Sequence, residues 1–474
     1  MDLSNAERVV IIGGGQAAAQ ACASLRQFGY DGAITLIGDE AALPYQRPPL
    51  SKAYMKGELA EERLYFKPAA WYEDQSIDAV LSMRATKIDR STQTVELEHG
   101  GAVAYDALII ATGSRPRPLP VEGADLDGVF DLRDLADVER IRPRMVAGQK
   151  LVIVGAGYIG LEAAAVARQM GLEVTVLEME DRVLARVTSP IMSTFFEQEH
   201  TRQGAVIKTG ARLASLRGAD GKVTTAILAD ESELAADIVL VGIGILPNVE
   251  LAEDAGIACS NGILTDRDAR TNDPRVFAAG DCAARPLVHY GRTGRLESVH
   301  NAIEQGKLAA AAIMGKPRPA EDCPWFWSDQ FDLKLQIAGL SQNYDQTVVR
   351  GDIEARKFAV FYLQNGKLIA VDAINSPPEF LASKKLIMTG ARLAPETLSD
   401  TSQSMKEIAM PGPMIRACLR RVIALRGRWS IMAARAGWKA STMRLSRASW
   451  RLLRLWASRG QQRIVPGFGR ISLI

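Results

Sequence analysis

The sequence predicts an α/β protein with two parallel-sheet domains, followed by a small α+β C-terminal domain. Residues 8–18, RVVIIGGGQAA, and residues 150–160, KLVIVGAGYIG, each begin as an apolar, β-branched strand and run through a glycine-rich turn into a helix. From residue 326 onward the pattern changes to strand-like runs, among them KFAVFYLQNGKLIAVDAIN (357–375), in which QNG predicts a hairpin turn. A length of 474 residues leaves room for about three domains.

The two glycine-rich turns have the spacing that binds a dinucleotide. Their motif residues are Gly13, Gly15 and Ala18 in the first turn and Gly155, Gly157 and Gly160 in the second. The first glycine of such a motif makes the tight turn, the second lets the backbone approach a pyrophosphate, and the third position lets helix and strand pack closely. The pyrophosphate then lies at the positive end of the helix. Two such units predict two Rossmann-like nucleotide domains.

Each unit has an acidic residue where its second strand ends. The first unit offers Asp39, with Glu40 as the alternative, and the second offers Glu178, twenty-three residues after Gly155. A carboxylate at this position accepts a hydrogen bond from the ribose 2′-hydroxyl and repels a 2′-phosphate. We therefore expect the second site to prefer NADH to NADPH, unless a nearby arginine, Arg182 or Arg186, offsets that charge.

Two further segments complete a recognisable order of motifs. Residues 105–120 form a buried strand that ends in Ala111, Thr112 and Gly113, and residues 271–283 form a strand that ends in Gly280 and Asp281. An aspartate at a strand end beside a helix suits the hydroxyl groups of a ribityl chain. In this order the four motifs resemble those of the pyridine nucleotide–disulfide oxidoreductase superfamily, which implies FAD at the first site and NADH at the second.

The loop at residues 43–52, LPYQRPPLSK, narrows the resemblance. Its prolines exclude a helix interior or a central strand, so it is a shaped loop. Disulfide-reducing members of the superfamily carry a cysteine pair at this place, and this chain has none there. Together with PWFWSDQFDLKLQIAGL (324–340), the loop resembles the NADH-dependent ferredoxin reductases of the putidaredoxin reductase and rhodocoxin reductase type. The resemblance covers residues 7–409.

The resemblance implies the positions of the site residues. The side chains expected at the reactive end are Lys52, paired with Glu162 near the flavin N5, and Trp327 over the exposed flavin edge. A solvated loop lysine and a core aromatic residue are the ordinary alternatives for Lys52 and Trp327, and Trp325 and Phe326 are expected to be packing residues. His300 receives no role. The residues expected around FAD are Gly13, Gly15, Ala17, Asp39, Arg47, Lys52, Ala85, Ala111, Thr112, Gly113, Arg133, Asp281 and Val299. Those expected around NADH are Gly155, Gly157, Tyr158, Ile159, Gly160 and Glu178.

The implied activity is electron transfer from NADH through FAD to a [2Fe–2S] ferredoxin that serves a cytochrome P450 or a ring-hydroxylating oxygenase. A cation beside N5 would stabilise the negative charge that develops as hydride arrives. Lys334, Lys384 and Lys385 are candidates for a basic patch that meets the ferredoxin. Two alternatives stay open: a reductase for rubredoxin or a small acceptor, and a flavoprotein that acts on a membrane or nucleic acid through a basic tail.

Domain boundaries follow from the motif order. We expect a discontinuous FAD domain (1–117 and 249–325), an NAD domain (118–248), a C-terminal domain (326–405) and a basic extension (406–474). The N-terminus has no signal-peptide pattern and no apolar run is long enough to span a membrane, so we expect a cytoplasmic protein. The scattered cysteines and histidines form no C-x-x-C motif or ligand-like pair, so no metal site is expected.

The C-terminal extension has a different composition from the rest of the chain. From Met410 to the end there are fourteen lysines and arginines, no aspartate or glutamate, and four of the seven tryptophans. Residues 443–460, MRLSRASWRLLRLWASRG, place four arginines on one face of a helix, a pattern typical of binding to anionic surfaces. The alternative, which this acid-free composition favours, is a disordered tail from a reading-frame change, without a role in the fold.

Overall fold

The first sheet is parallel throughout and combines strands that are distant in the sequence. The structure, a computed structural model, describes residues 3–410. The strands lie in the order β20-β7-β1-β2-β3, and every neighbouring pair is parallel. They are β1 (Arg8–Ile12), β2 (Ala33–Ile37), β3 (Ile77–Val80), β7 (Ala107–Ile110) and β20 (Val276–Ala278).

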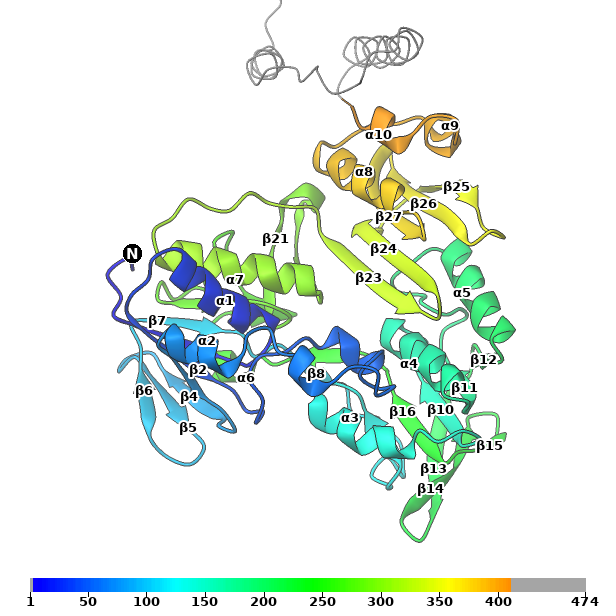
Figure 1. Cartoon of the computed structure of the whole chain (residues 1–474), viewed down its shortest axis with the longest axis horizontal. Helices are drawn as coiled ribbons and strands as arrows, with labels where there is room; N and C mark the ends of the chain where they lie inside the picture. The colour runs from blue at the N-terminus through cyan, green and yellow to red at the C-terminus, as the bar shows by residue number, and fades with distance from the viewer. Residues whose placement is uncertain (1–2, 411–474) are drawn as a thin grey trace, which may run out of the picture. The chain divides into compact units, whose positions relative to one another are not determined.

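Alternate residues of β1 face two different cores. Val9 and Ile11 pack with the helices α1 and α7, whereas Val10 and Ile12 pack with a small antiparallel sheet on the opposite face. Burial on both faces explains why this strand reads as a continuous apolar run. Helices α1 and α7 run alongside each other (Figure 1). The elements of the two faces are α1 (Gln16–Gln27), α2 (Ala69–Asp74), α7 (Val299–Ile313), β4 (Ala85–Asp89), β5 (Thr94–Leu97) and β6 (Ala102–Ala104).

The second sheet repeats the architecture of the first. Its strands lie in the order β12-β11-β10-β16-β9 and are all parallel. Helix α4 follows the second glycine turn, and the antiparallel strands β13, β14 and β15 pack on the other face. The elements are β9 (Val129–Asp131), α3 (Leu135–Ile141), β10 (Lys150–Val154), α4 (Tyr158–Gln169), β11 (Glu173–Leu177), α5 (Pro190–Arg202), β12 (Val206–Lys208), β13 (Leu213–Ala219), β14 (Lys222–Leu228), β15 (Glu233–Ala235) and β16 (Ile238–Val241).

The whole second sheet is inserted between β7 and β20 of the first. The chain passes from the first domain into the second and back through two adjacent strands, β8 (Ser114–Pro116) and β17 (Ile245–Pro247), which form a two-stranded antiparallel ribbon. The remaining elements before residue 314 are the 3₁₀ helices η1 (Pro48–Ser51), η2 (Glu61–Arg63), η3 (Arg142–Arg144) and η4 (Val288–Tyr290), helix α6 (Glu250–Asp254), and the strands β18 (Cys259–Ser260), β19 (Gly262–Leu264), β21 (Ala283–Leu287) and β22 (Arg292–Arg295).

The C-terminal part is an antiparallel sheet with helices on it. The strand order is β23-β24-β27-β26-β25. The expected hairpin is confirmed: Asn365 and Gly366 join β26 to β27 with φ angles of +50° and +72°, as a tight hairpin turn requires. The elements are β23 (Trp325–Gln330), β24 (Leu333–Gly339), β25 (Gln346–Asp352), β26 (Lys357–Gln364), β27 (Lys367–Ile374), α8 (Pro377–Met388), α9 (Pro395–Ser399) and α10 (Met405–Ile408).

The predicted fold class is confirmed, with two α/β nucleotide-type domains and a small α+β domain. The core of the third domain includes Met405 and also Ile408, which lies beyond the expected end of that domain at residue 405. Within residues 3–410 no helix has the length and apolarity to cross a membrane, and no group of His, Cys, Asp and Glu could hold a metal ion. The basic segment 443–460 lies outside the described residues.

Candidate functional site

A cleft of about 1040 Å³ opens where the strands of the first sheet end. The residues that follow β1, β7 and β20 line it, and this edge of a parallel sheet is where such folds bind ligands. The other domains also contribute: Tyr158, Ile159 and Glu162 come from α4, and Phe326 and Trp327 from β23. The described part of the chain thus brings three domains together around one cleft.

The first glycine turn forms a cradle for a phosphate group. Gly13 has a φ of +118°, and a Cβ there would lie 2.2 Å from the carbonyl oxygen of Ala111, so only glycine fits. Gly14 and Gly15 face open space, and Gly15 caps helix α1 without any side-chain hydrogen bond to the first N–H groups. Backbone donors at the positive end of α1 therefore remain available for a pyrophosphate.

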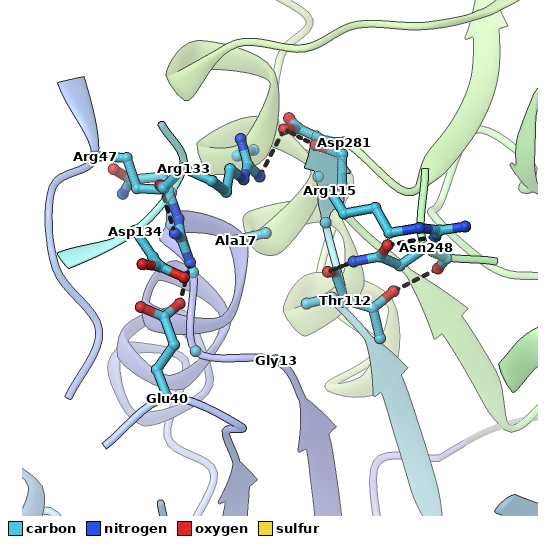
Figure 2. A pocket seen from close by; sticks show the side chains of 18 of the residues that line it. Gly13, Ala17, Glu40, Arg47, Thr112, Arg115, Arg133, Asp134, Asn248 and Asp281 are labelled. Carbon is cyan, nitrogen blue, oxygen red and sulfur yellow. Dashed lines mark hydrogen bonds and ion pairs between the residues drawn. The ribbon is translucent and has the colours of Figure 1, made fainter. Parts of the chain in front are cut away.

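Two arginines stand beside this turn. Arg47 of the proline loop donates to the carbonyl oxygen of Arg133 at 3.0 Å and pairs with Glu40, and Tyr45 also donates to Glu40, at 2.5 Å. Burial lowers the pKa of Arg133, and the neighbouring positive charge of Arg47 lowers it further. Figure 2 shows Gly13 and Ala17 between this cluster and the residues Thr112 and Asn248. Two cations held close together favour binding of a doubly charged pyrophosphate.

Asp281 lies at the end of β20, beside the start of α7. Its carboxylate accepts hydrogen bonds from Ser114 Oγ at 3.0 Å and from Arg133 Nη2 at 3.4 Å (Figure 2). Ser298 caps α7 by accepting from the N–H of Asn301. The aspartate keeps lone pairs free for hydroxyl groups in the cleft, as a ribityl chain requires.

The proline loop and helix α4 meet at the other end of the cleft. Pro48–Ser51 forms a 3₁₀ turn that places Lys52 at its end, and Lys52 Nζ lies 2.6 Å from Glu162 Oε2. Ser51 Oγ donates to the same oxygen at 2.7 Å. The side chain of Glu162 is buried, so the carboxylate is held by partners from outside its own helix.

Aromatic rings of β23 line the same cleft as this ion pair. Phe326 and Trp327 of β23 both line the cleft, and Phe326 packs on Tyr158 with ring centroids 5.0 Å apart. Trp327 packs on Trp325 at 5.4 Å. The expectation that Phe326 is only a packing residue is therefore incomplete, because this ring also forms cleft wall.

The second glycine turn repeats the geometry of the first. Gly155 has a φ of +104°, and a Cβ there would lie 2.4 Å from the carbonyl oxygen of Gly242. A Cβ on Gly160 would lie 2.2 Å from the carbonyl oxygen of Gly155, whereas Gly157 faces open space. The turn and the helix are thus packed as closely as the motif requires, with room left for a pyrophosphate.

Glu178 is anchored beside this second turn. Its Oε2 accepts from the N–H of Ala156 at 2.8 Å, and its Oε1 accepts from the N–H of Glu180 at 3.0 Å. Arg182 cannot offset the charge freely, because it donates to the carbonyl oxygens of Thr188 and Ala185 and to Ser193 Oγ. Large apolar side chains are exposed next to the turn and next to Glu178, at Ile159 and Met179. Exposed apolar surface at this position suits an adenine ring.

The residues assigned to FAD from the sequence all line the first cleft. Tyr158, Ile159, Glu162 and Trp327 line it as well, whereas Gly155, Gly157, Gly160 and Glu178 form the second turn outside it. The cleft-lining FAD residues are Gly13, Gly15, Ala17, Asp39, Arg47, Lys52, Ala85, Ala111, Thr112, Gly113, Arg133, Asp281 and Val299.

Sequence reasoning missed several partners of these residues. Ser51 and Ser328 both donate to Glu162, and no motif singles out a serine for this role. Of the two adjacent acids, Glu40 is tied into the arginine cluster, while Asp39 has a side chain 59% exposed and lies 3.6 Å from Arg84. Both line the cleft, and Asp39 is the one whose carboxylate lies outside the arginine cluster.

The lysines considered for a basic patch differ in their surroundings. Lys384 Nζ lies 2.7 Å from Asp322, which also lies 3.3 Å from His300 Nε2, so part of its charge is neutralised locally. His300 is buried against Trp325, with ring centroids 5.6 Å apart, in agreement with a packing role. Lys334 is exposed on β24.

Comparison with known proteins agrees with this geometry. Residues 7–306 match the family described as pyridine nucleotide-disulphide oxidoreductase, and residues 325–409 match the family described as reductase C-terminal. Rhodocoxin reductase of Rhodococcus erythropolis is 42% identical over 398 residues, which make up 84% of this chain and 93% of that protein. A rubredoxin-NAD(+) reductase of Pseudomonas putida is 38% identical over 369 residues, 78% of this chain and 96% of that protein.

A solved structure extends the comparison to three dimensions. The reductase in the crystal structure of a covalent putidaredoxin reductase–putidaredoxin complex matches with a TM-score of 0.83 and 42% sequence identity. The match covers 85% of this chain and 98% of that one, so all three folded domains take part.

Proposed function

The chain belongs to the pyridine nucleotide-disulphide oxidoreductase family, and we propose that it transfers electrons from NADH through bound FAD to a [2Fe–2S] ferredoxin. The observation that carries the proposal is the Lys52–Glu162 pair at the reactive end of the cleft. No cysteine is found among the described residues that line this cleft. Reduction of a disulfide needs a reactive cysteine, so the electrons are expected to leave to a separate acceptor protein.

The first cleft has the donor set and the size that FAD requires. The Gly13 turn and the start of α1 would hold the pyrophosphate, Arg47 and Arg133 would neutralise it, and Asp281 would accept from the ribityl hydroxyls. A Cβ at Gly13 would collide with the Ala111 carbonyl oxygen, and this close packing shapes the cradle. When bound, FAD supplies the chemistry that accepts a hydride from NADH and releases electrons one at a time.

The chain's own residues orient the reactants and set the local charge. Lys52 holds a positive charge in the cleft, and Glu162 keeps its ammonium group in place. Trp327 and Phe326 add apolar wall to this cleft, and a less polar surrounding strengthens the electrostatic effect of the lysine. Glu178, anchored on Ala156, would accept from the ribose 2′-hydroxyl of NADH, so NADH is the expected donor.

The domain assignment follows from the same reasoning. We assign the FAD domain to residues 1–117 and 249–325 and the NADH domain, which also lends Arg133 and Glu162 to the FAD cleft, to residues 118–248. Contacts with the acceptor are assigned to a C-terminal domain that extends to residue 409. Inclusion of α10 in the third core supports that last boundary. We further propose a cytoplasmic location and a ferredoxin that serves a cytochrome P450 or a ring-hydroxylating oxygenase.

Reduction of rubredoxin is the second candidate, because a rubredoxin-NAD(+) reductase is 38% identical to this chain. The two are separated by assays of the purified flavoprotein with NADH and a series of [2Fe–2S] ferredoxins or rubredoxins, with cytochrome c as the final acceptor. Half-maximal turnover at a lower concentration of a ferredoxin than of any rubredoxin supports the proposal. Turnover with rubredoxins alone contradicts it.

A further inference from the structure

Glu162 is held by more donors than an ion pair alone would provide. The residue is 4% exposed. Its Oε2 accepts from Lys52 Nζ at 2.6 Å and from Ser51 Oγ at 2.7 Å, and its Oε1 accepts from Ser328 Oγ at 2.6 Å. Lys52 and Ser51 therefore fix one oxygen, and Ser328 alone fixes the other. A carboxylate bound at both oxygens cannot rotate about its terminal bond without losing a hydrogen bond.

Ser328 has its proton directed at Glu162 by its own neighbour. The serine is 1% exposed on β23, and its Oγ accepts from Gln330 Nε2 at 3.2 Å. A hydroxyl has a single proton, and the amide nitrogen of Gln330 can only donate. The hydroxyl proton of Ser328 therefore points to Glu162.

His200 fixes the orientation of Gln330. The amide oxygen Oε1 of Gln330 lies 2.8 Å from His200 Nε2, and an amide oxygen can only accept, so Nε2 carries the proton. His200 is buried on α5, and burial lowers its pKa, which favours the neutral ring. The result is a one-way series of donors, from His200 to Gln330 to Ser328 to Glu162.

We propose that Ser328 is a positioning residue for flavin reduction: through Glu162 it holds Lys52 in the orientation that stabilises charge on the flavin. The proposal rests on the proposed function, since it assigns Ser328 to the same reactive end. It also gives β23 of the C-terminal domain a direct contact with the Lys52–Glu162 pair, through the hydrogen bond of Ser328 to Glu162. Charge-assisted hydrogen bonds between buried groups are the strongest positioning contacts available here.

The test compares Ser328→Ala with Ser383→Ala. Ser383 is a buried serine of the same domain whose hydroxyl has no hydrogen-bond partner among residues 3–410, so its removal controls for loss of a buried hydroxyl. We expect Ser328→Ala to slow flavin reduction by NADH about tenfold in anaerobic rapid mixing, with the NADH concentration at half-saturation and the flavin content unchanged. The midpoint potential of its flavin should fall by about 30 mV, the two-electron equivalent of tenfold. Ser383→Ala should match the wild type in each measurement.

A double-mutant cycle shows whether Ser328 acts through Glu162. In a Glu162→Gln background, Ser328→Ala should add less than a twofold further slowing, because the carboxylate that it orients is gone. Equal slowing in both backgrounds, or a Ser328→Ala protein with the wild-type rate and potential, overturns the proposal. If Ser328→Ala loses its flavin, Ser328→Cys, which keeps the volume with a weak donor, takes its place under the same criteria. A wild-type protein whose flavin NADH does not reduce overturns the proposed function and this inference together.

Discussion

We expect Glu178 to determine which nucleotide the second site accepts, and its replacement by glutamine tests that assignment. The carboxylate is anchored through both oxygens, at 2.8 Å from the N–H of Ala156 and 3.0 Å from the N–H of Glu180. Each oxygen keeps a second lone pair, so the group can accept from a ribose hydroxyl without moving. Glutamine has the same size and can keep one of these backbone contacts, so the Glu178→Gln variant removes the charge and one acceptor with little change in volume.

The magnitude follows from two opposite effects. Loss of a hydrogen bond to a charged acceptor weakens NADH binding by about 1.5–3 kcal/mol. Removal of the repulsion of a 2′-phosphate about 4 Å away improves NADPH binding by about 1 kcal/mol even if the site is as polar as water. The lower estimate for NADH, about 1.5 kcal/mol, and the gain of about 1 kcal/mol for NADPH together shift the NADH/NADPH preference about 70-fold. Arg186, exposed near Gly244, would add to the gain for NADPH.

The assay is rapid anaerobic mixing of the flavoprotein with each nucleotide, with the half-saturating concentration read from the rate of flavin bleaching. Glu180→Gln is the matched control, because that carboxylate is exposed, lies two residues away, and belongs to a residue that binds Glu178 through its backbone N–H. A Glu178→Gln protein with the wild-type preference for NADH over NADPH would show that this carboxylate does not bind the ribose.

Three further outcomes are expected. Lys52→Met leaves Glu162 buried without its cation, so the free energy of unfolding in urea should fall by about 3 kcal/mol. Flavin reduction by NADH should slow about a hundredfold, because the positive charge near the flavin is lost. A rate of flavin reduction within twofold of wild type would contradict this. Burial raises the pKa of Asp372 to about 6, above the ~3.9 of an unfolded chain. The folded protein therefore binds this proton more tightly than the unfolded chain does, which adds about 3 kcal/mol to the free energy of unfolding below pH ~4. That contribution is lost as the pH rises through 6. The free energy of unfolding of Asp372→Asn in urea should lack this part of the pH dependence. A pH profile of stability equal to that of the wild type would show that another group causes it. Since the family matches end at residue 409, removal of residues 411–474 should leave flavin content and NADH oxidation intact, and loss of flavin would show the tail to be needed.

Local sequence patterns predicted the features that depend on neighbouring residues. The Gly13 and Gly155 turns, and the hairpin at Asn365–Gly366, follow from backbone conformations that few residues other than glycine and asparagine adopt. Burial of β1 on both faces likewise follows from its continuous apolar run. These elements could be placed in order along the chain, and their order was enough to indicate the two sheets.

The site's long-range partners could not be predicted in the same way. Ser51 lies 111 residues from Glu162 and Ser328 lies 166 residues from it, and only the packing of three domains brings their hydroxyls to one carboxylate. Asp39 and Glu40 are adjacent acids at one strand end. In the structure Glu40 accepts a hydrogen bond from the Tyr45 hydroxyl, a contact that no local pattern predicts. Serine and tyrosine hydroxyls occur throughout the chain, so their pairing depends on the folded geometry.

The central claim is that one chain binds FAD in the first cleft and takes electrons from NADH at the second turn. Anaerobic addition of NADH, and separately of NADPH, to the purified protein while the visible flavin spectrum is recorded tests it most directly. We expect a yellow protein with one FAD per chain that NADH bleaches at far lower concentration than NADPH. A colourless protein, or a flavin that neither nucleotide reduces, would contradict the account.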